Sequence, residues 1–292
     1  MGVWRLDKEK YITVTVDVEE WFHSNWFNVK QVIDSNYHGD YPQTEIVENT
    51  KQIISLFDEL SIKGTFFILG ETAIKYPEII DLVRDRDHEI ASHGFFHNWN
   101  GTSQETFANH LRIFKKYVYA HPKGFRFPNY NFTERILEVL HQEGFLYDSS
   151  VVPSFNIPGW YGDPHLPLLP YKYALSNGSL IEFPISVSPY LRIPGAGGWF
   201  LRNCGLPWTT FLTYFHASVE QYANIYFHTW EISTKNPSLP RIPFHVFRNT
   251  GKPMLNRIRS LIYSWKKKKN YHIEAFEDLL DHEINTTCRP VL

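Results

Sequence analysis

The stretch ITVTVDVEEWFH, Ile12–His23, has the pattern of a half-buried strand that ends in acidic residues. Apolar and polar side chains alternate from Ile12 to Val18, and successive side chains of a strand point to opposite faces of a sheet. One face is therefore apolar, whereas the other ends in Asp17 and Glu19. Two carboxylates on one face indicate either an ion-paired strand end or a functional site.

Strand-like and helix-like segments alternate along the rest of the chain. This alternation predicts an α/β protein with a parallel sheet, either doubly wound or closed into a barrel. The expected strands cover residues 12–19, 64–70, 88–94, 124–128, 145–150, 179–186 and 224–232. The expected helices cover residues 44–60, 71–86 with a break at Pro77, 102–118, 133–145 and 207–222. We place the start of helix 102–118 at a capping box formed by Thr102 and Glu105.

We expect one domain over residues 1–292, because no internal repeat and no linker divides the chain. Residues 151–206 are rich in Pro, Gly and aromatic side chains and interrupt the regular pattern. They are expected to form an irregular insertion. Residues 254–292 are expected to form a helical C-terminal tail.

The composition indicates a globular protein without a strong charge bias. The 292-residue chain is 43% hydrophobic and has a formal net charge of −2, which gives no electrostatic reason to expect a nucleic acid as partner. The N-terminus lacks the apolar segment of a secretory signal, and no apolar run reaches the ~18 residues of a membrane span. We therefore expect a soluble, cytoplasmic protein, for which the run Lys266–Lys269 offers at most a weak contact with a membrane surface.

Polar and titratable side chains gather at the carboxyl ends of the expected strands, where the active sites of parallel α/β folds lie. Taken strand by strand, these side chains are Asp17 and Glu19, His93 and His97, Arg126, Asp148, and His228. Each has an ordinary explanation on its own, but their occurrence on successive strand ends favours a single functional site.

His93 and His97 are candidate metal ligands. Their spacing of four residues fits one helical turn, so that both imidazoles can reach one ion, although histidines at this spacing are more often surface neighbours. A site with two histidines needs a third ligand and an open position for water, and either Glu19 or Asp17 could supply that ligand. The other carboxylate would then be free to act as a general base on the metal-bound water.

Arg126, Asp148 and His228 are expected to support this chemistry. Arg126 and Asp148 are interpreted as groups around the site, because an arginine bonded to a carboxylate would hold a general base in place and keep it ionised. His228 lies on the same strand face as Trp230 and suits a general acid for a leaving amine.

The order of these motifs resembles that of the polysaccharide deacetylases, the NodB-like carbohydrate esterases of family 4. The resemblance extends from about Ile12 to Glu231, which is most of the chain, and it is specific as a set although no single motif is. The motifs TVDVEEWFH, SHGFFH, GFRFPNYNF, YDSSVVPS and YFHTWEI look most like the branch found in bacterial exopolysaccharide and surface-glycan gene clusters.

The resemblance implies a distorted (β/α)7 barrel, the NodB-homology fold. It also implies a metal-dependent hydrolase that removes an N-acyl group, usually acetyl, from an amino sugar of a polysaccharide or glycan precursor. The implied ion is divalent, zinc first, with cobalt, nickel or manganese as alternatives. Carried over by position, the implied roles are general base for Asp17, metal ligand for His93 and His97, orientation of the base for Arg126, and general acid for His228, with Asp148 and Trp230 as neighbours.

The sequence departs from the family pattern at three places. Many members carry two adjacent aspartates on the first strand, the second being a metal ligand, whereas this chain has Val18 there and Glu19 next. Relatives are known in which the second acid follows the first aspartate after one intervening residue, as Glu19 follows Asp17 here. This arrangement supports Glu19 as the metal ligand and leaves the division of roles between Asp17 and Glu19 open. Gly94 replaces the usual Ser or Thr after the first histidine, and Asn129 stands where an aromatic residue commonly follows the proline.

Contacts with the substrate are expected from three regions. A backbone N–H near Asn129 or Tyr130 would hold the oxyanion of a tetrahedral intermediate. Trp160 and Trp199 in the irregular stretch are candidates for sugar stacking, as is Trp230, and packing on the barrel explains the stretch equally well. The alternative functions are a deformylase, another amide hydrolase such as an allantoinase-like enzyme, and a glycan-binding protein that has lost catalysis.

Overall fold

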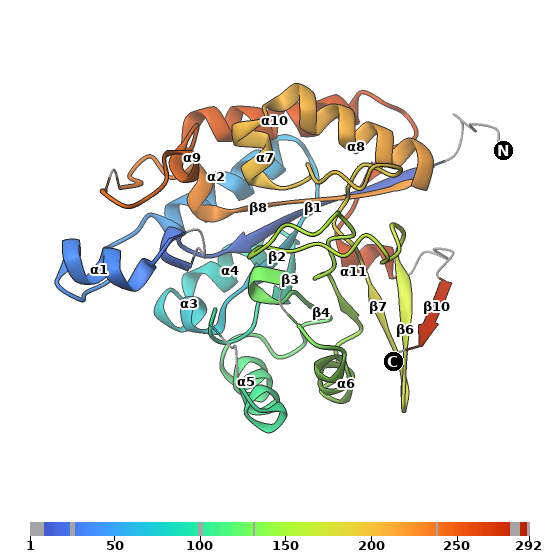
Figure 1. Cartoon of the computed structure of the whole chain (residues 1–292), viewed down its shortest axis with the longest axis horizontal. Coiled ribbons are helices and arrows are strands. Elements are labelled where there is room, and N and C mark those ends of the chain that lie inside the picture. Colours follow the sequence, from blue (N-terminus) through green and yellow to red (C-terminus); the bar gives the residue numbers. More distant parts are fainter. Residues whose placement is uncertain are drawn as a thin grey trace.

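Helices surround a curled central sheet (Figure 1), and the computed structural model describes residues 9–23, 27–98, 102–130, 132–237, 239–280 and 287–290. The strands are β1 (Lys10–Val18), β2 (Thr65–Ile68), β3 (Glu89–Ser92), β4 (Gly124–Phe125), β5 (Tyr147–Asp148), β6 (Tyr171–Leu175), β7 (Gly178–Glu182), β8 (Tyr222–His228), β9 (Tyr271–Ile273) and β10 (Thr287–Pro290). The helices are α1 (Val29–Tyr37), α2 (Ile46–Glu59), α3 (Gly70–Lys75), α4 (Glu78–Arg84), α5 (Gln104–Tyr117), α6 (Glu134–Gln142), α7 (Gly198–Asn203), α8 (Leu206–Glu220), α9 (Phe244–Phe247), α10 (Lys252–Lys266) and α11 (Phe276–Leu279).

β1 lies inside the sheet, because both of its edges are paired. It runs parallel to β2 on one side and to β8 on the other. Val14, Val16 and Val18 are buried in the largest hydrophobic cluster. The alternation predicted from the sequence is confirmed, because Asp17 and Glu19 point away from that cluster toward a common partner, His228.

The sheet has the order β10-β6-β7-β5-β4-β3-β2-β1-β8, with β9 beside β1. Neighbours are parallel throughout the run from β7 to β8, which confirms the expected α/β class. The sheet is a curled half-barrel, since the described residues form no strand ladder between β7 and β8. The chain after β7 bridges this gap: Ser186 N–H donates to Asn224 O (3.1 Å), and Gly197 forms an isolated parallel bridge with Tyr226.

The prediction of a purely helical C-terminal tail is wrong. α10 and α11 are helical as expected, but β9 pairs with the start of β1 and β10 pairs with β6. Within the irregular stretch, β6 and β7 form an antiparallel pair. Of these strands, only β7 was expected, within residues 179–186. β6, β9 and β10 were missed, because their pairing depends on a sheet edge supplied by distant segments.

Two helix boundaries test the expected start and stop signals. Pro77 separates α3 from α4, as predicted from its inability to continue a helix. α5 does not begin at the expected capping box of Thr102 and Glu105. Ser103 is the N-cap instead, and its hydroxyl accepts from Thr106 N–H (3.2 Å).

The carboxyl ends of the parallel strands lie level with one another. Ile68 is in register with both Val18 and Ser92. Phe125 is in register with Ser92 and with Asp148, so side chains just beyond these strands meet at one edge of the sheet. In Figure 1 that edge faces α1 and α3, and α8 lies along β1 and β8.

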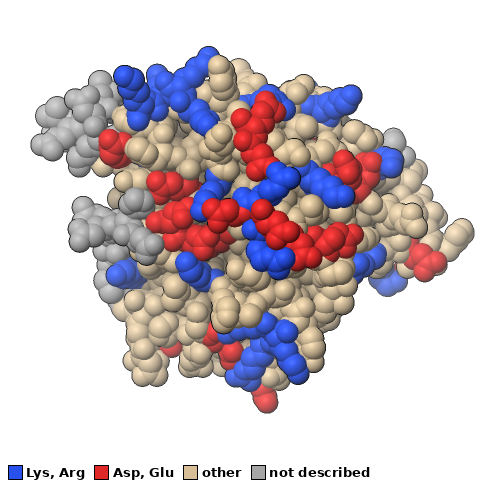
Figure 2. Space-filling model, turned by 180° about the vertical axis from the view of Figure 1, so that it is seen from behind, with Lys and Arg blue, Asp and Glu red and all other residues tan. Residues whose placement is uncertain are grey.

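Charged side chains of both signs are mixed on the surface. Figure 2 shows acidic and basic residues beside one another on the face turned away from Figure 1. Examples of such pairs are Lys63 with Asp87 (2.6 Å) and Arg84 with Asp81 (2.5 Å). Among the described residues, no helix is long and apolar enough to span a bilayer.

Candidate active site

Glu19, His93 and His97 bring three metal-binding atoms together beyond the ends of β1 and β3. His93 Nε2 lies 3.5 Å and His97 Nε2 lies 3.0 Å from the same oxygen, Glu19 Oε2. The candidate ligand atoms all lie within 4.8 Å of one another, and the three residues are buried. Two imidazoles and a carboxylate are a usual ligand set for zinc and related divalent ions.

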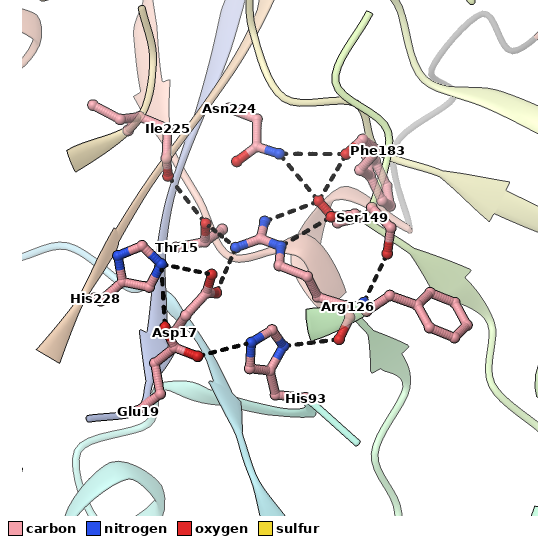
Figure 3. Close-up of polar contacts among 12 residues, drawn as sticks. Thr15, Asp17, Glu19, His93, Arg126, Ser149, Phe183, Asn224, Ile225 and His228 are labelled. Carbon is pink, nitrogen blue, oxygen red and sulfur yellow. Dashed lines mark hydrogen bonds and ion pairs between the residues drawn. The ribbon is translucent and has the colours of Figure 1, made fainter. Parts of the chain in front are cut away.

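His93 is held with Nε2 toward Glu19 (Figure 3). Its Nδ1 lies 2.8 Å from Arg126 O. A carbonyl oxygen can only accept, so Nδ1 carries the proton and Nε2 keeps its lone pair for a metal.

His97 does not reach the site through a helical turn, which the four-residue spacing had suggested. Residues 93–97 form a bend after β3, and α5 begins only at Gln104. Gly94 has a φ of 85°, a conformation that glycine adopts without steric cost, and the chain turns there. Glu71 Oε1 then accepts from His97 N–H (3.2 Å). The departure at Gly94 therefore has a conformational reason.

Thr229 clamps the backbone of Glu19. Glu19 N–H donates to Thr229 Oγ1 (3.1 Å), and the same hydroxyl donates to Glu19 O (2.7 Å). These two bonds leave the carboxylate of Glu19 free to face His93 and His97.

The residues present fit a divalent cation. Glu19 Oε2 is buried, and the polar atoms facing it are His97 Nε2 at 3.0 Å and His93 Nε2 at 3.5 Å. Imidazole nitrogens that present lone pairs and a carboxylate oxygen repel one another unless a cation lies among them. Burial would raise the pKa of Glu19, but the imidazoles of His97 and His228 bring that pKa well below its usual value. The carboxylate is therefore ionised and available as a ligand.

Arg126 holds the carboxylate of Asp17 (Figure 3). Arg126 Nη1 donates to Asp17 Oδ1 (2.7 Å) and to Thr15 Oγ1 (2.9 Å), and its Nε and Nη2 donate to Ser149 O and Oγ (both 2.9 Å). The guanidinium is fully buried and lies 4.1 Å from the centre of the Phe67 ring. The contact with Asp17 uses one nitrogen, so Asp17 Oδ2 stays free of Arg126.

His228 faces both acids from the neighbouring strand. Its Nε2 lies 3.4 Å from Glu19 Oε1 and 3.9 Å from Asp17 Oδ2. The Trp230 ring stacks on the imidazole, with ring centres 5.8 Å apart and planes 18° from parallel. Burial would lower the pKa of His228, but the carboxylates of Glu19, Glu231 and Asp17 raise that pKa to about 9.

Glu231 is a site residue that the sequence reasoning missed. Its Oε2 lies 3.2 Å from His228 Nδ1 and accepts from His228 N–H (2.9 Å), while its Oε1 accepts from Arg202 Nε (2.6 Å). Burial would raise the pKa of Glu231, but Arg202 and His228 lower that pKa to about 2. Gly198 leaves room for this carboxylate, because a Cβ there would lie 1.9 Å from Glu231 Oε2. The available signal was an acid three residues after His228 in FHTWE.

Among the described residues, Asp148 contacts Ser150 and Glu182 and has no contact with His228, although the resemblance implied that it is a neighbour of His228. Ser150 Oγ donates to Asp148 Oδ1 (2.8 Å), and the neighbouring strand residue is Glu182. Burial raises the pKa of Asp148 to about 7 and brings that of Glu182 well above its usual value. The two carboxyl groups are therefore not both ionised at neutral pH, and Glu231 occupies the position beside His228 that was expected for Asp148.

A small cavity of about 50 Å³ connects the ligand atoms with Asp17 and His228. All the expected substrate-contact residues line it, namely Asn129, Tyr130, Trp160, Trp199 and Trp230. Arg126 and Asp148 are not among its lining residues. The lining residues that were not predicted are His23, Phe127, Arg202, Tyr226 and Glu231.

The turn after β4 contributes Asn129 and Tyr130 to the lining of this cavity. Asn129 and Tyr130 have φ angles of 56° and 55°, an uncommon pair of left-handed conformations for side chains with a Cβ. Tyr130 N–H already donates to Phe127 O (3.1 Å). Asn129 N–H is therefore the better candidate of the two to donate to a developing oxyanion.

Two family models match successive parts of the chain. Residues 29–147 match the model described as polysaccharide deacetylase, and residues 149–271 match one described as a domain of unknown function (DUF3473). The first segment carries His93, His97 and Asn129, and the second carries Arg202, His228 and Glu231. Asp17 and Glu19 precede both segments. The segment of unknown function thus contributes several of the residues that line the cavity.

One curated protein is similar to part of this chain. A peptidoglycan-N-acetylglucosamine deacetylase of Bacillus cereus is 25% identical over 124 residues, which are 38% of this chain and 45% of that protein. The chain thus matches less than half the length of this curated relative.

Two solved structures share the fold. One is a Mycobacterium smegmatis protein designated a polysaccharide deacetylase, with a TM-score of 0.66 and 18% identity over 96% of this chain and 92% of that one. The other is a family-4 carbohydrate esterase pseudoenzyme of Bacillus anthracis, with a TM-score of 0.54 and 11% identity over 96% of this chain and 70% of that one. The curled sheet is therefore the NodB-like fold that the motifs implied.

Proposed function

This chain carries a polysaccharide deacetylase domain at residues 29–147, and on that premise we propose that it is a metal-dependent hydrolase that removes the N-acetyl group of an amino sugar in a glycan. One observation carries the proposal. The ligand atoms of Glu19, His93 and His97 lie in the same buried cavity as Asp17 and His228. A metal site beside a base and an acid is one arrangement that catalyses amide hydrolysis.

Glu19, His93 and His97 would hold the ion. Zinc suits two imidazoles and one carboxylate with an open position for water, and cobalt, nickel or manganese accept the same donors. When bound, the ion supplies Lewis acidity that polarises an amide carbonyl and makes a water molecule more acidic.

Asp17 is proposed to take the proton of the attacking water. Arg126 engages Asp17 Oδ1, so Oδ2 is the oxygen available for the proton. Glu19 does not receive a hydrogen bond from Arg126 and faces the two imidazoles instead. This difference in surroundings favours Glu19 as the ligand and Asp17 as the base, the division that the sequence left open.

His228 is proposed to protonate the leaving amine as the C–N bond breaks. The carboxylates of Glu231 and Asp17, together with that of Glu19, raise the pKa of His228 above its usual value, which favours the protonated imidazole. Glu231 fixes the ring through Nδ1, which leaves Nε2 to face the cavity. Trp230 stacks on the ring and limits its rotation.

Acetate release by the purified protein tests the proposal. We expect activity on N-acetylated amino sugars to disappear when a chelator removes the metal and to return when zinc or cobalt is added. N-formyl and ureide substrates measured in parallel distinguish a deformylase and an allantoinase-like enzyme from a deacetylase. Faster turnover of either substrate than of the N-acetyl compound would contradict the proposed acyl group.

A glycan-binding protein without catalysis is the second candidate, because one neighbour of the same fold is a pseudoenzyme. Metal analysis separates the two. Protein that takes up no stoichiometric divalent metal and releases no acetate after reconstitution would support the binding protein.

A further inference from the structure

The outer surface of α8 is unusually apolar for an exposed helix. In Figure 1, α8 and α10 lie side by side along the top of the molecule, with α8 over β1 and β8. From Leu206 to Val219, α8 contains no Asp, Glu, Lys or Arg. Phe211, near the middle of this helix, is nevertheless 62% exposed. A helix that is apolar on every side is usually buried, so its exposed side indicates an interaction surface.

A turn after β7 adds two more apolar side chains to this surface. Tyr190 and Leu191 are 68% and 70% exposed. The ring of Tyr190 lies against Phe215 of α8, with ring centres 5.7 Å apart. Phe215 in turn stacks on Phe211, with ring centres 5.8 Å apart and planes 16° from parallel. These four side chains form one continuous surface, here called the apolar patch.

The turn of the apolar patch is anchored to the body of the protein. Arg192 Nη1 donates to Leu166 O (2.9 Å) and to Pro153 O (3.3 Å). The guanidinium is therefore used within the protein, and it fixes the turn that carries Tyr190 and Leu191. The patch is a permanent feature of the surface, because it depends on anchored backbone.

Basic side chains adjoin the patch on the side of α10. α10 and the three residues after it contain no acidic residue and seven basic ones, namely Lys252, Arg257, Arg259 and Lys266–Lys269. Lys267–Lys269, here called the lysine cluster, are exposed and form no ion pair with any residue that the structure describes. Lys268 Nζ lies 5.9 Å from the centre of the Tyr214 ring. Tyr214 is on α8 between Phe211 and Phe215, so the cluster lies beside the apolar patch.

This combination favours a membrane surface over a protein as the occupant. The whole chain has a formal net charge of −2, so the positive charge of the cluster is a local feature. Lysines attract anionic phospholipid headgroups, and neighbouring apolar side chains enter the boundary of the acyl chains. A protein partner must match a surface in shape, whereas apolar side chains that protrude singly need only a fluid layer.

We propose that the apolar patch and the lysine cluster together dock the protein on a bilayer that contains anionic phospholipids. The contact is peripheral, since no helix of the described residues is long and apolar enough to span a bilayer. β9, which follows the lysine cluster, pairs with the amino end of β1, whereas the candidate active site lies at the carboxyl ends of the strands. The docking face thus excludes the candidate site, and the proposal does not depend on the reaction.

Co-sedimentation of the intact protein with vesicles tests the proposal. The vesicles consist of phosphatidylcholine alone, or of phosphatidylcholine with about one third phosphatidylglycerol. We expect at least about tenfold tighter binding to the anionic vesicles, because each lysine near such a surface contributes about fivefold. Raising the salt from about 0.1 M to about 1 M shortens the screening length from about 10 Å to about 3 Å and should release most of the bound protein.

Replacement of the lysine cluster tests where the charge acts. Changing all three of its residues to Gln should weaken binding to anionic vesicles at least about tenfold. The charge-matched control combines Lys51→Gln, Lys116→Gln and Lys235→Gln, which alter exposed lysines on α2, on α5 and after β8. The control should bind nearly as the parent does, because charges more than about 10 Å from the membrane are screened.

Substitutions in the apolar patch test insertion. Leu191→Gln and Phe211→Gln should each weaken binding about five- to tenfold, because a polar amide replaces a side chain that enters the acyl boundary. Tyr117→Gln is the control, since Tyr117 is 63% exposed on α5, and it should leave binding unchanged.

The outcomes decide between a membrane and other occupants. Equal binding to the two kinds of vesicle would overturn the proposal, as would equal effects of the lysine-cluster variant and its control. Dimerisation seen by light scattering and abolished by Phe211→Gln, without vesicle binding, would assign the patch to a second copy of the chain instead. The lipid and salt comparisons use the unsubstituted protein, so they decide even where a variant is unstable.

Discussion

Asp17 and His228 are directly opposite one another in the parallel β1–β8 pair, and Asp17 Oδ2 lies 3.9 Å from His228 Nε2. Each is held from its own side, Asp17 by Arg126 and His228 by Glu231. A base and an acid on adjacent strands can therefore reach the two sides of one amide without moving the backbone. The following predictions test what each supporting contact contributes.

Asp17→Asn should lower acetate release by about 10²–10⁴-fold, because the amide cannot accept the proton of water as a base does. Metal content should be unchanged, since the ligand cluster consists of Glu19, His93 and His97. Glu19→Gln should instead lose the metal. Turnover and metal analysis of both variants check the division of roles, and loss of metal from Asp17→Asn with retention in Glu19→Gln would reverse it.

Thr229→Val should weaken metal binding by about 10–100-fold, the range seen when a group that positions a ligand is removed. The substitution removes the hydroxyl that accepts from Glu19 N–H and donates to Glu19 O. Competition with a coloured chelator measures the affinity. Thr210→Val on α8 is the control. Equal metal affinities of the two variant proteins would show that the two hydrogen bonds from Thr229 do not position Glu19.

Glu231→Gln should move the alkaline limit of activity to lower pH. His228 must be protonated to donate, so activity persists below its pKa of about 9 and falls above it. Removing the Glu231 carboxylate removes one of the charges that raise this pKa, which shifts the loss of activity toward neutral pH. Gly198→Ala, which crowds the same carboxylate, should shift the limit in the same direction.

A pH profile of kcat/KM checks this shift. Glu59→Gln removes an exposed carboxylate that is paired with Arg259, and it should leave the limit where it is. If the alkaline limit of activity is the same in Glu231→Gln as in the unsubstituted protein, Glu231 does not influence the pKa of His228.

Glu89 should make the fold less stable as pH rises from about 4.5 to about 7. Burial raises the pKa of Glu89 to about 7, against hydrogen bonds from Thr65 and Tyr147 that lower it. The native state therefore holds this proton at pH values where the unfolded chain has lost it. The stabilisation is complete below the pKa of Glu89 in the unfolded chain, about 4.5, and is lost as the pH rises through its pKa in the folded protein, about 7. Each pKa unit of difference corresponds to about 1.4 kcal/mol, so the free energy of unfolding should fall by about 3 kcal/mol over this pH range.

Urea unfolding between pH 4 and 8 measures this dependence. Glu89→Gln cannot titrate and should flatten the curve by a corresponding amount. Because Asp148 and Glu182 contribute with the same sign, the difference between the two proteins is the relevant quantity. Identical slopes would contradict the raised pKa of Glu89.

Local patterns predicted much of the fold. The alternation from Ile12 to Val18 placed Asp17 and Glu19 on one face, and Pro77 ended a helix where expected. Both follow from the geometry of adjacent residues, which is present in the sequence. The start of α5 at Ser103 was missed by one residue, because neighbouring polar side chains can compete for the same cap.

Contacts between distant segments were less predictable. Asp148 was expected beside His228, yet the short helical turn after β8 brings Glu231 there instead. Gly198 is essential to that arrangement only because α7 packs against the turn. Neither relation has a local signature in the sequence, since each depends on how separate elements meet.

The sequence by itself determined the strand–helix order, the face of β1 that carries two acids, and the set of polar side chains at the strand ends. These properties depend on side-chain periodicity and on the level ends of parallel strands. The tertiary structure agrees with the implied contacts of Glu19 with the two imidazoles and of Arg126 with Asp17. Only the tertiary structure decided that Glu231 supports His228 and that a second, larger cavity shares residues with the site. The reason is that distances of 3–4 Å between side chains arise from the packing of segments far apart in the chain, which no local pattern encodes.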